Sequence, residues 1–256
     1  MQAGVRFANS DHEFSACFQL RHKVYVEEMD RFTNKSNHDL KELQDEDDKH
    51  ARSIIAIKDN QPIGTLRLFW GGDRNFTQEQ NQAYQIGAFK PLLQENKICI
   101  VERLMVDNKY RGSMTALRMY KEVMNFVLLN QLEVVLLDCE PHHIKAYLKL
   151  GFRPFAKQYN YPGIGPVIPM ALIVGDFNHL ETVGSPFANL ITKNNLTFCR
   201  HTAELKKIML FESKVTSQLD SYKDKIVKNF YSTRKSLLKN RSNILDNRLK
   251  LKLQGC

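Results

Sequence analysis

The chain of 256 residues is long enough for one sizeable domain with an appendage, and its composition, 43% hydrophobic and 25% charged, is that of a globular protein. No stretch approaches the roughly 18–20 consecutive apolar residues that cross a bilayer, and the first residues lack the apolar core of a secretory signal. These features argue against a membrane-spanning protein and predict a cytoplasmic one.

The positive charge is concentrated at one end of the sequence. Of the formal net charge of +9, residues 201–256 carry +8 and the first 200 residues carry only +1. We therefore predict a domain at residues 1–195 and a basic amphipathic helical extension at residues 196–256. Its lysines surround apolar residues that recur at helical spacing, namely Leu219, Tyr222, Ile226 and Phe230.

A basic amphipathic helix can serve several ends. It can bind an anionic membrane surface, dock on an acidic partner, pack on its own domain or form an oligomer. No interleaving of aromatic and basic residues accompanies the charge, which disfavours nucleic-acid binding. The sequence leaves the other four uses open, peripheral membrane association among them.

The cysteines and histidines form no recognisable disulfide or metal pattern. The five cysteines are odd in number and scattered, without a C-x-x-C pair, and no H-E-x-x-H motif occurs. We expect reduced, structural thiols and no metal site.

Apolar periodicity and turn residues predict the secondary structure. Ser10 and Glu13 have capping-box spacing before apolar residues at helical intervals, which predicts the first helix. In chain order we expect a helix at 11–28, a loop at 30–48, strands at 53–58 and 63–70, a loop at 71–82, a short helix at 84–95, a strand at 98–106, a helix at 113–130, a strand at 134–138, a helix at 142–150, and strands at 152–158 and 167–174. This order predicts a mixed α/β fold with a strand–helix–strand crossover at its centre.

The stretch VDNKYRGSMTALRMYKEV, residues 106–123, joins a strand to a helix through a basic, glycine-containing turn. The start of a helix leaves N–H groups without partners and carries partial positive charge. Ser113 at this place either caps the helix or contacts a bound phosphate. The turn alone does not decide between the two.

The elements around this turn resemble the GNAT superfamily of acyltransferases. An apolar strand, VVLLD, comes next, and then a helix that ends in Tyr147-Leu148-Lys149-Leu150-Gly151-Phe152. The resemblance implies a mixed, mainly antiparallel twisted sheet flanked by helices. In that family the turn holds the phosphates of coenzyme A or of a phosphopantetheine arm. The corresponding residues are Arg111, Gly112, Ser113, Met114, Thr115 and Ala116, with methionine at a position where glycine is usual.

The resemblance also assigns chemistry to the neighbouring strand and helix. Backbone groups of the strand, at Leu104 and Val106, would hold the thioester and polarise its carbonyl. Tyr147 is at the position of the proton donor to the departing thiolate, unless it is a packing residue of an amphipathic helix. Glu102 is a second catalytic candidate. Because it is adjacent to Arg103 on a strand, we expect at most one of the two to face the cleft.

Two further segments resemble the acyl-homoserine-lactone synthases and the long-chain N-acyl amino acid synthases of this superfamily. They are LRHKVYVEEMDRF, residues 20–32, and DEDDKHARSIIAIKDNQPIGTLRL, residues 45–68. Ile100 and Leu43 stand where the lactone synthases have acidic residues, which favours the amino acid branch. The residues at the corresponding positions, predicted to bind the acceptor, are Arg21, Tyr25, Asp45, Asp48, Arg67 and Arg103.

The chemistry of an amino acid suits these residue types. Carboxylates orient an ammonium, and arginine pairs with a carboxylate through two hydrogen bonds. The alternative is that residues 45–48 form a solvated charge run with Arg21 as an ion-pair partner.

Together these resemblances predict an N-acyltransferase that moves a medium or long acyl chain from acyl-CoA or acyl carrier protein to the amine of an amino acid. The thioester is a co-substrate, and no permanently bound cofactor is expected. Two alternatives remain: an acetyl-CoA-dependent N-acetyltransferase, and a degenerate regulatory module in which Met114 blocks the phosphate cradle. Retention of Arg111, Tyr147 and Arg67 together favours catalysis.

Overall fold

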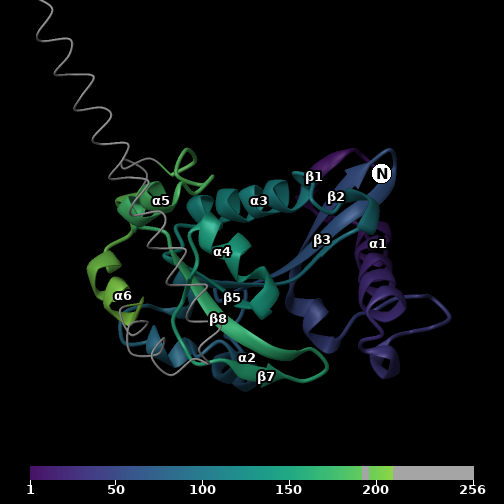
Figure 1. Ribbon diagram of the computed structural model, residues 1–256, viewed down its shortest axis with the longest axis horizontal. Helices are drawn as coiled ribbons and strands as arrows, with labels where there is room; N and C mark the ends of the chain where they lie inside the picture. The colour runs from purple at the N-terminus through teal and green to yellow at the C-terminus, as the bar shows by residue number, and fades with distance from the viewer. Residues whose placement is uncertain (192–195, 210–256) are drawn as a thin grey trace, which may run out of the picture.

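The computed structural model describes residues 1–191 and 196–209 (Figure 1). Most of the predicted basic extension, including its apolar stripe, lies outside the described residues. Within them, no helix is long and apolar enough to cross a membrane.

One twisted sheet runs through the whole domain. Its strands lie in the order β1-β2-β3-β4-β5-β8-β6, and β7 pairs with β8 beside this path. Neighbouring strands are antiparallel except for the central pair β4 and β5, which is parallel. The bounds are β1 Gly4–Phe7, β2 Arg52–Lys58, β3 Gln61–Trp70, β4 Ile98–Val106, β5 Val134–Cys139, β6 Arg153–Pro154, β7 Tyr159–Tyr161 and β8 Gly165–Ile173. The predicted mixed, mainly antiparallel sheet is therefore confirmed.

Helices cover both faces of the sheet (Figure 1). The parallel pair needs a crossover, which α3 provides on one face together with α4 and α5. On the other face lie α1, α2 and α6. The bounds are α1 Asp11–Arg21, α2 Gln78–Ala83, α3 Thr115–Leu129, α4 Ile144–Leu150, α5 Phe177–Val183 and α6 Thr202–Met209.

Two apolar layers result from the alternation of side chains along the central strands. On β4, Cys99 and Val101 pack under α3, whereas Ile98 and Ile100 pack on the opposite layer. The same alternation divides β5 and β8. Because both faces are covered, these strands are nearly continuous apolar runs rather than alternating ones.

Three predicted elements differ from the structure. The expected loop at 71–82 contains α2, which begins at the capping box of Thr77 and Gln80, and the expected helix at 84–95 has only short 3₁₀ turns. The expected strand at 152–158 is reduced to β6, a two-residue strand at the edge of the sheet. The structure also adds β1 and β7, which were not predicted. All are short elements, for which local pattern is a weak guide.

The first part of the predicted extension packs on the domain. Leu205 and Met209 of α6 are buried against the same apolar layer as Ile98 and Ile173. Where the chain stops being part of the folded domain stays a prediction.

Candidate active site

The central strands β4 and β5 separate part-way along their length. They pair only where Ile98–Ile100 runs beside Val134–Leu136. Beyond these pairs β4 continues to bond β3, and β5 continues to bond β8, but the two no longer bond each other. The gap is a cavity of about 670 Å³, of the size that encloses small-molecule ligands.

A bulge in β4 shapes one wall of this cavity. Between the pairs Thr65–Met105 and Arg67–Glu102, β3 has one residue and β4 has two. Arg103 takes the extra turn with φ +52°, a left-handed conformation that is uncommon for arginine. The bulge breaks the alternation, so Glu102 and Arg103 both line the cavity. The prediction that at most one of them faces the cleft was wrong for this reason.

The basic turn before α3 forms one end of the cavity. Arg111, Gly112 and Ser113 line it together with Ala116. Gly112 has φ +78°, which glycine adopts without strain. The N-cap of α3 is Met114, but the Ser113 hydroxyl accepts the N–H of Thr115, the first residue of the helix, at 3.3 Å and also lies at the cavity.

Two residues of the predicted cradle do not line the cavity. The Met114 side chain is 54% exposed to solvent, and Thr115 is buried beside Gly64. Methionine in the usual glycine position therefore does not fill the space in front of the helix, which removes the reason to regard the cradle as blocked.

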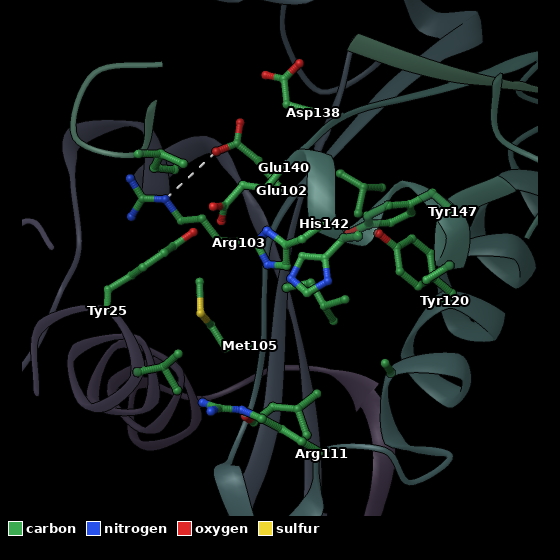
Figure 2. A pocket seen from close by; sticks show the side chains of 18 of the residues that line it. Tyr25, Glu102, Arg103, Met105, Arg111, Tyr120, Asp138, Glu140, His142 and Tyr147 are labelled. Carbon is green, nitrogen blue, oxygen red and sulfur yellow. Dashed lines mark hydrogen bonds and ion pairs between the residues drawn. The ribbon is translucent and has the colours of Figure 1, made fainter. Parts of the chain in front are cut away.

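Arg111 is held at the rim by two contacts. Its Nε donates to the Val106 carbonyl at 3.1 Å, and its guanidinium forms an ion pair with Glu28. Figure 2 shows Arg111 at one end of the cavity and Asp138 at the other, with Tyr147 and Tyr120 on one side and Tyr25 on the opposite side.

Tyr147 is presented to the cavity from α4. Gly151 ends this helix with φ +108°, where a Cβ would meet a methyl of Leu180 at 2.3 Å. The chain then turns back, and Phe152 packs edge-on against Tyr147 with ring centroids 5.9 Å apart. Tyr120 hydrogen bonds with Tyr147, but burial dominates and raises the pKa of Tyr147. The phenol is therefore protonated at neutral pH and able to donate.

Tyr25 and the residues after it close the side opposite α4. The Tyr25 ring lies edge-on to Phe32 at 5.1 Å, and both line the cavity. Arg31 makes two hydrogen bonds of 3.0 Å to Glu140, just beyond β5. This ion pair ties the loop after α1 to the far wall of the site.

The other predicted acceptor-binding residues form an ion network behind the cavity. Arg67 contacts Asp45 at 2.7 Å, Asp48 at 3.1 Å and Glu102 at 2.6 Å. Arg21 in turn pairs with Asp48 at 2.6 Å, and Arg103 pairs with Asp45. Of this network only Glu102 and Arg103 line the cavity.

The network is buried and strongly coupled. Arg21 is fully buried and Arg67 is 2% exposed. Burial acts to lower the pKa of Arg67, but the three carboxylates around it raise that pKa well above its ordinary value. Burial acts to raise the pKa of Asp48, but Arg21 and Arg67 lower it to about 2. Arg67 and Asp48 are therefore charged at neutral pH, and the network fixes Glu102 at the cavity wall.

Sequence reasoning missed several residues at the acidic end of the cavity. Asp138 and Glu140 line it from the end of β5, and Tyr84 lines it from the residue after α2. The Tyr84 hydroxyl donates to Glu102 at 3.2 Å. A carboxylate that follows an apolar run, as in VVLLD, was the available signal for Asp138. Nothing local marks Tyr84. Within the described part of the chain, no three Asp, Glu, His or Cys side chains come together as metal ligands.

A family model described as N-acyl amino acid synthase FeeM matches residues 16–173 of the chain. The chain belongs to this family. The FeeM-family match spans the elements that enclose the cavity, from α1 to β8. Members are acyltransferases, and the reaction of this protein is N-acylation. Among curated protein sequences, none matches the chain.

Solved structures agree with the fold. The structure of FeeM, an N-acyl amino acid synthase from uncultured soil microbes, superposes with a TM-score of 0.56 at 15% identity, over 73% of this chain and 97% of that one. BjaI, a CoA-dependent acyl-homoserine lactone synthase solved with SAM and isopentyl-CoA, gives 0.57 at 16% identity, over 72% and 91%. The resemblance to this branch of acyltransferases is confirmed.

The ion network predicts a large effect of Asp48 on stability. Asp48→Asn leaves Arg21 buried without its carboxylate, which typically costs about 3–5 kcal/mol in free energy of unfolding. Asp47→Asn, on the same turn, breaks only a partly exposed pair with Arg74 and should cost less than about 1 kcal/mol. Urea unfolding of both variants measures the difference, and equal losses would contradict it.

The loss of stability in Asp48→Asn should depend on pH. The folded-state pKa of Asp48 lies below its ordinary value of 3.8, at about 2. Its contribution is thus present above about pH 4 and is lost as the pH falls toward 2. The gap in unfolding free energy between the wild-type protein and Asp48→Asn should narrow over that range.

Proposed function

We propose that this protein transfers a medium or long acyl chain from acyl-CoA or acyl carrier protein to the amine of an amino acid. One observation carries the proposal: a single cavity has a helix start with a basic residue at one end, Tyr147 on its side, and carboxylates with Arg103 at the other end. These are the groups that a phosphate, a leaving thiolate and a zwitterionic amine each require.

The donor enters from the end at Arg111. Its phosphate lies against the turn and the N-terminus of α3, where N–H groups and the helix dipole favour an anion. The rest of the pantetheine arm follows the edge of β4, which β5 leaves unpaired after Ile100. Leu104 and Val106, on this edge, line the cavity where the arm would pass.

The thioester carbonyl takes its place at the bulge. Two successive residues of β4, Arg103 and Leu104, have no register partner on β3. A backbone N–H aimed at the carbonyl oxygen stabilises the negative charge that develops as the amine attacks. The bond from carbon to nitrogen forms, the bond from carbon to sulfur breaks, and Tyr147 gives its proton to the sulfur.

The acceptor occupies the end at Glu102. Its ammonium lies near the carboxylates, and its carboxylate lies near Arg103. Arg103 Nη1 supports this placement, because it is buried and has no hydrogen-bond partner among the described residues. An unpaired buried donor is costly, and a substrate carboxylate would satisfy it.

Family membership supports an amino acid as acceptor, and BjaI, with isopentyl-CoA bound, supports a CoA thioester as donor. The apolar part of the lining supports a chain longer than acetyl. It includes Val24, Met29, Phe32, Met105, Leu117 and Ile164. An acidic carrier protein or an anionic membrane as partner of the basic extension stays a prediction.

Charge reversal at Arg111 should weaken binding of the acyl donor. Arg111→Glu removes the cation, places a carboxylate beside Glu28, and should raise the dissociation constant of acyl-CoA at least tenfold, about 1.4 kcal/mol. Arg118→Glu makes the same charge change on the exposed side of α3, outside the cavity. Calorimetric titration of both proteins should show a loss only at Arg111; an unchanged constant would overturn the phosphate site.

Removal of the Tyr147 hydroxyl should lower turnover without weakening binding of the donor. Tyr147→Phe keeps the ring contacts with Tyr120 and Phe152, and we expect turnover to fall roughly 100-fold. The dissociation constant of the donor serves as a control and should stay the same. The unfolding free energy should fall by only about 1 kcal/mol, for the lost hydrogen bond with Tyr120. Wild-type turnover in the folded variant would return Tyr147 to a packing role.

Competition between donors tests the chain length. Octanoyl-, decanoyl- and palmitoyl-CoA, each mixed with an equal amount of acetyl-CoA and a panel of amino acids, should yield mainly the longer N-acyl product in mass spectra. A preference for acetyl would move the protein to the N-acetyltransferases. Binding of thioester without any product would favour a regulatory module.

A further inference from the structure

A second carboxyl group lines the acidic end of the cavity and is left unused by the chemistry above. Asp138 is on β5, just beyond the last residue of β5 that pairs with β4. In Figure 2 it lies at the opposite end from Arg111. The ionisable groups around it are Glu102 on β4, Tyr84 after α2, and Tyr159 on β7.

The two oxygens of Asp138 have different surroundings. Oδ2 accepts a hydrogen bond from the Tyr159 hydroxyl. Oδ1 is buried and has no hydrogen-bond partner among the described residues. A buried acceptor without a donor is unfavourable, since it has lost its bonds to water. Asp138 lines the substrate cavity, and a donor on the ligand would satisfy this oxygen.

Glu102 offers no such oxygen. Its Oε2 is bound by the Arg67 guanidinium at 2.6 Å, and its Oε1 accepts the Tyr84 hydroxyl at 3.2 Å. Glu140 is likewise committed, to Arg31. Of the three carboxyl groups that line the cavity, only Asp138 lacks a cationic partner within the described residues. An incoming ammonium can therefore pair with Asp138 without displacing an arginine.

The pKa of Asp138 allows its carboxyl group to take up and release a proton near neutral pH. Burial raises the pKa of Asp138 to about 7, and the charge of Glu102 adds to this, although the hydrogen bond from Tyr159 opposes it. A base acts best when its pKa is close to the working pH, because it is then both ionised and able to hold a proton.

We propose that Asp138 is the catalytic base that deprotonates the ammonium of the acceptor, while Glu102, held by Arg67, orients that ammonium without taking its proton. This inference rests on the proposed function. The ammonium loses one proton to Asp138 Oδ1 and becomes the neutral amine that attacks the thioester carbon. After the attack the nitrogen loses a second proton, which restores the hydroxyl of Tyr147 once Tyr147 has protonated the departing thiolate. Asp138 returns its own proton to solvent.

Comparing two acceptors, one that needs a base and one that does not, separates a catalytic role of Asp138 from a structural role. Hydroxylamine is mostly uncharged at neutral pH, whereas the amine of an amino acid is mostly protonated. Asp138→Asn keeps the size and the contact with Tyr159. With an amino acid as acceptor, its kcat/KM at pH 7.5 should fall about 100-fold or more, within the range of acid–base contributions. With hydroxylamine it should fall less than about fivefold.

The pH profile of a second variant gives an independent reading that does not depend on how well Asp138→Asn folds. Activity of the wild-type protein should rise with pH through the pKa of the ionising base. Tyr159→Phe removes a hydrogen bond that favours ionised Asp138, so the rising limb should move to higher pH. In Asp138→Asn the limb set by the pKa of Asp138 should be lost, and activity should rise only at the higher pH where the acceptor ammonium loses its proton in solution.

The outcomes distinguish a failure of Asp138 as the base from a failure of the proposed function. Transfer by the wild-type protein to any amino acid supports the proposed function, whatever the variants do. If Asp138→Asn then loses amino acid and hydroxylamine transfer equally, or if Tyr159→Phe leaves the rising limb in place, Asp138 is not the base. If the wild-type protein makes no N-acyl product from any donor, the proposed function fails and this inference fails with it.

Discussion

The separation of β4 from β5 is the constraint on which the rest of the molecule depends. Backbone groups in the middle of a sheet need hydrogen-bond partners, and leaving them buried without any is costly. These two strands bond through only three residue pairs and then diverge. The edge of β4 beyond Ile100 must be satisfied by water or by a ligand. The fold therefore creates its binding site at the only break inside its central sheet, between the described strands.

The wall of that break is strained and is held in place from behind. A left-handed conformation at Arg103 costs of order 1 kcal/mol or more, and it persists only where the surroundings enforce it. Arg67 enforces it from β3, because it is bonded both to Glu102 on the bulged strand and to Asp45 and Asp48 on the loop before β2. Four of the predicted acceptor-binding residues thus lie behind the cavity and position Glu102 and Arg103, which line it. These four are Arg21, Asp45, Asp48 and Arg67.

Much of the fold could be predicted from the sequence, because long apolar runs indicate buried strands and an amphipathic pattern indicates a helix with one buried face. The phosphate turn and Tyr147 could be predicted as well, since each lies in a motif of consecutive residues. The bulge could not, because arginine at a left-handed position leaves no local signature as glycine would. Tyr84, Asp138 and Tyr159 come together from three separate elements, and their relation depends on strand order. The same is true of Arg31 and Glu140.

The two ends of the cavity differ in charge. At one end, the positive end of the α3 dipole and Arg111 face the space, and they favour an anion. At the other end, two of the three carboxyl groups are paired with arginines, which leaves Asp138 as the one without a cationic partner among the described residues. In the proposed reaction the first end attracts the phosphate of the donor, whereas the second end offers the ammonium of the acceptor an unpaired carboxyl group. In the proposed reaction these two preferences favour one orientation of donor and acceptor. The reacting carbon and nitrogen would then meet between the ends, beside the bulge and Tyr147.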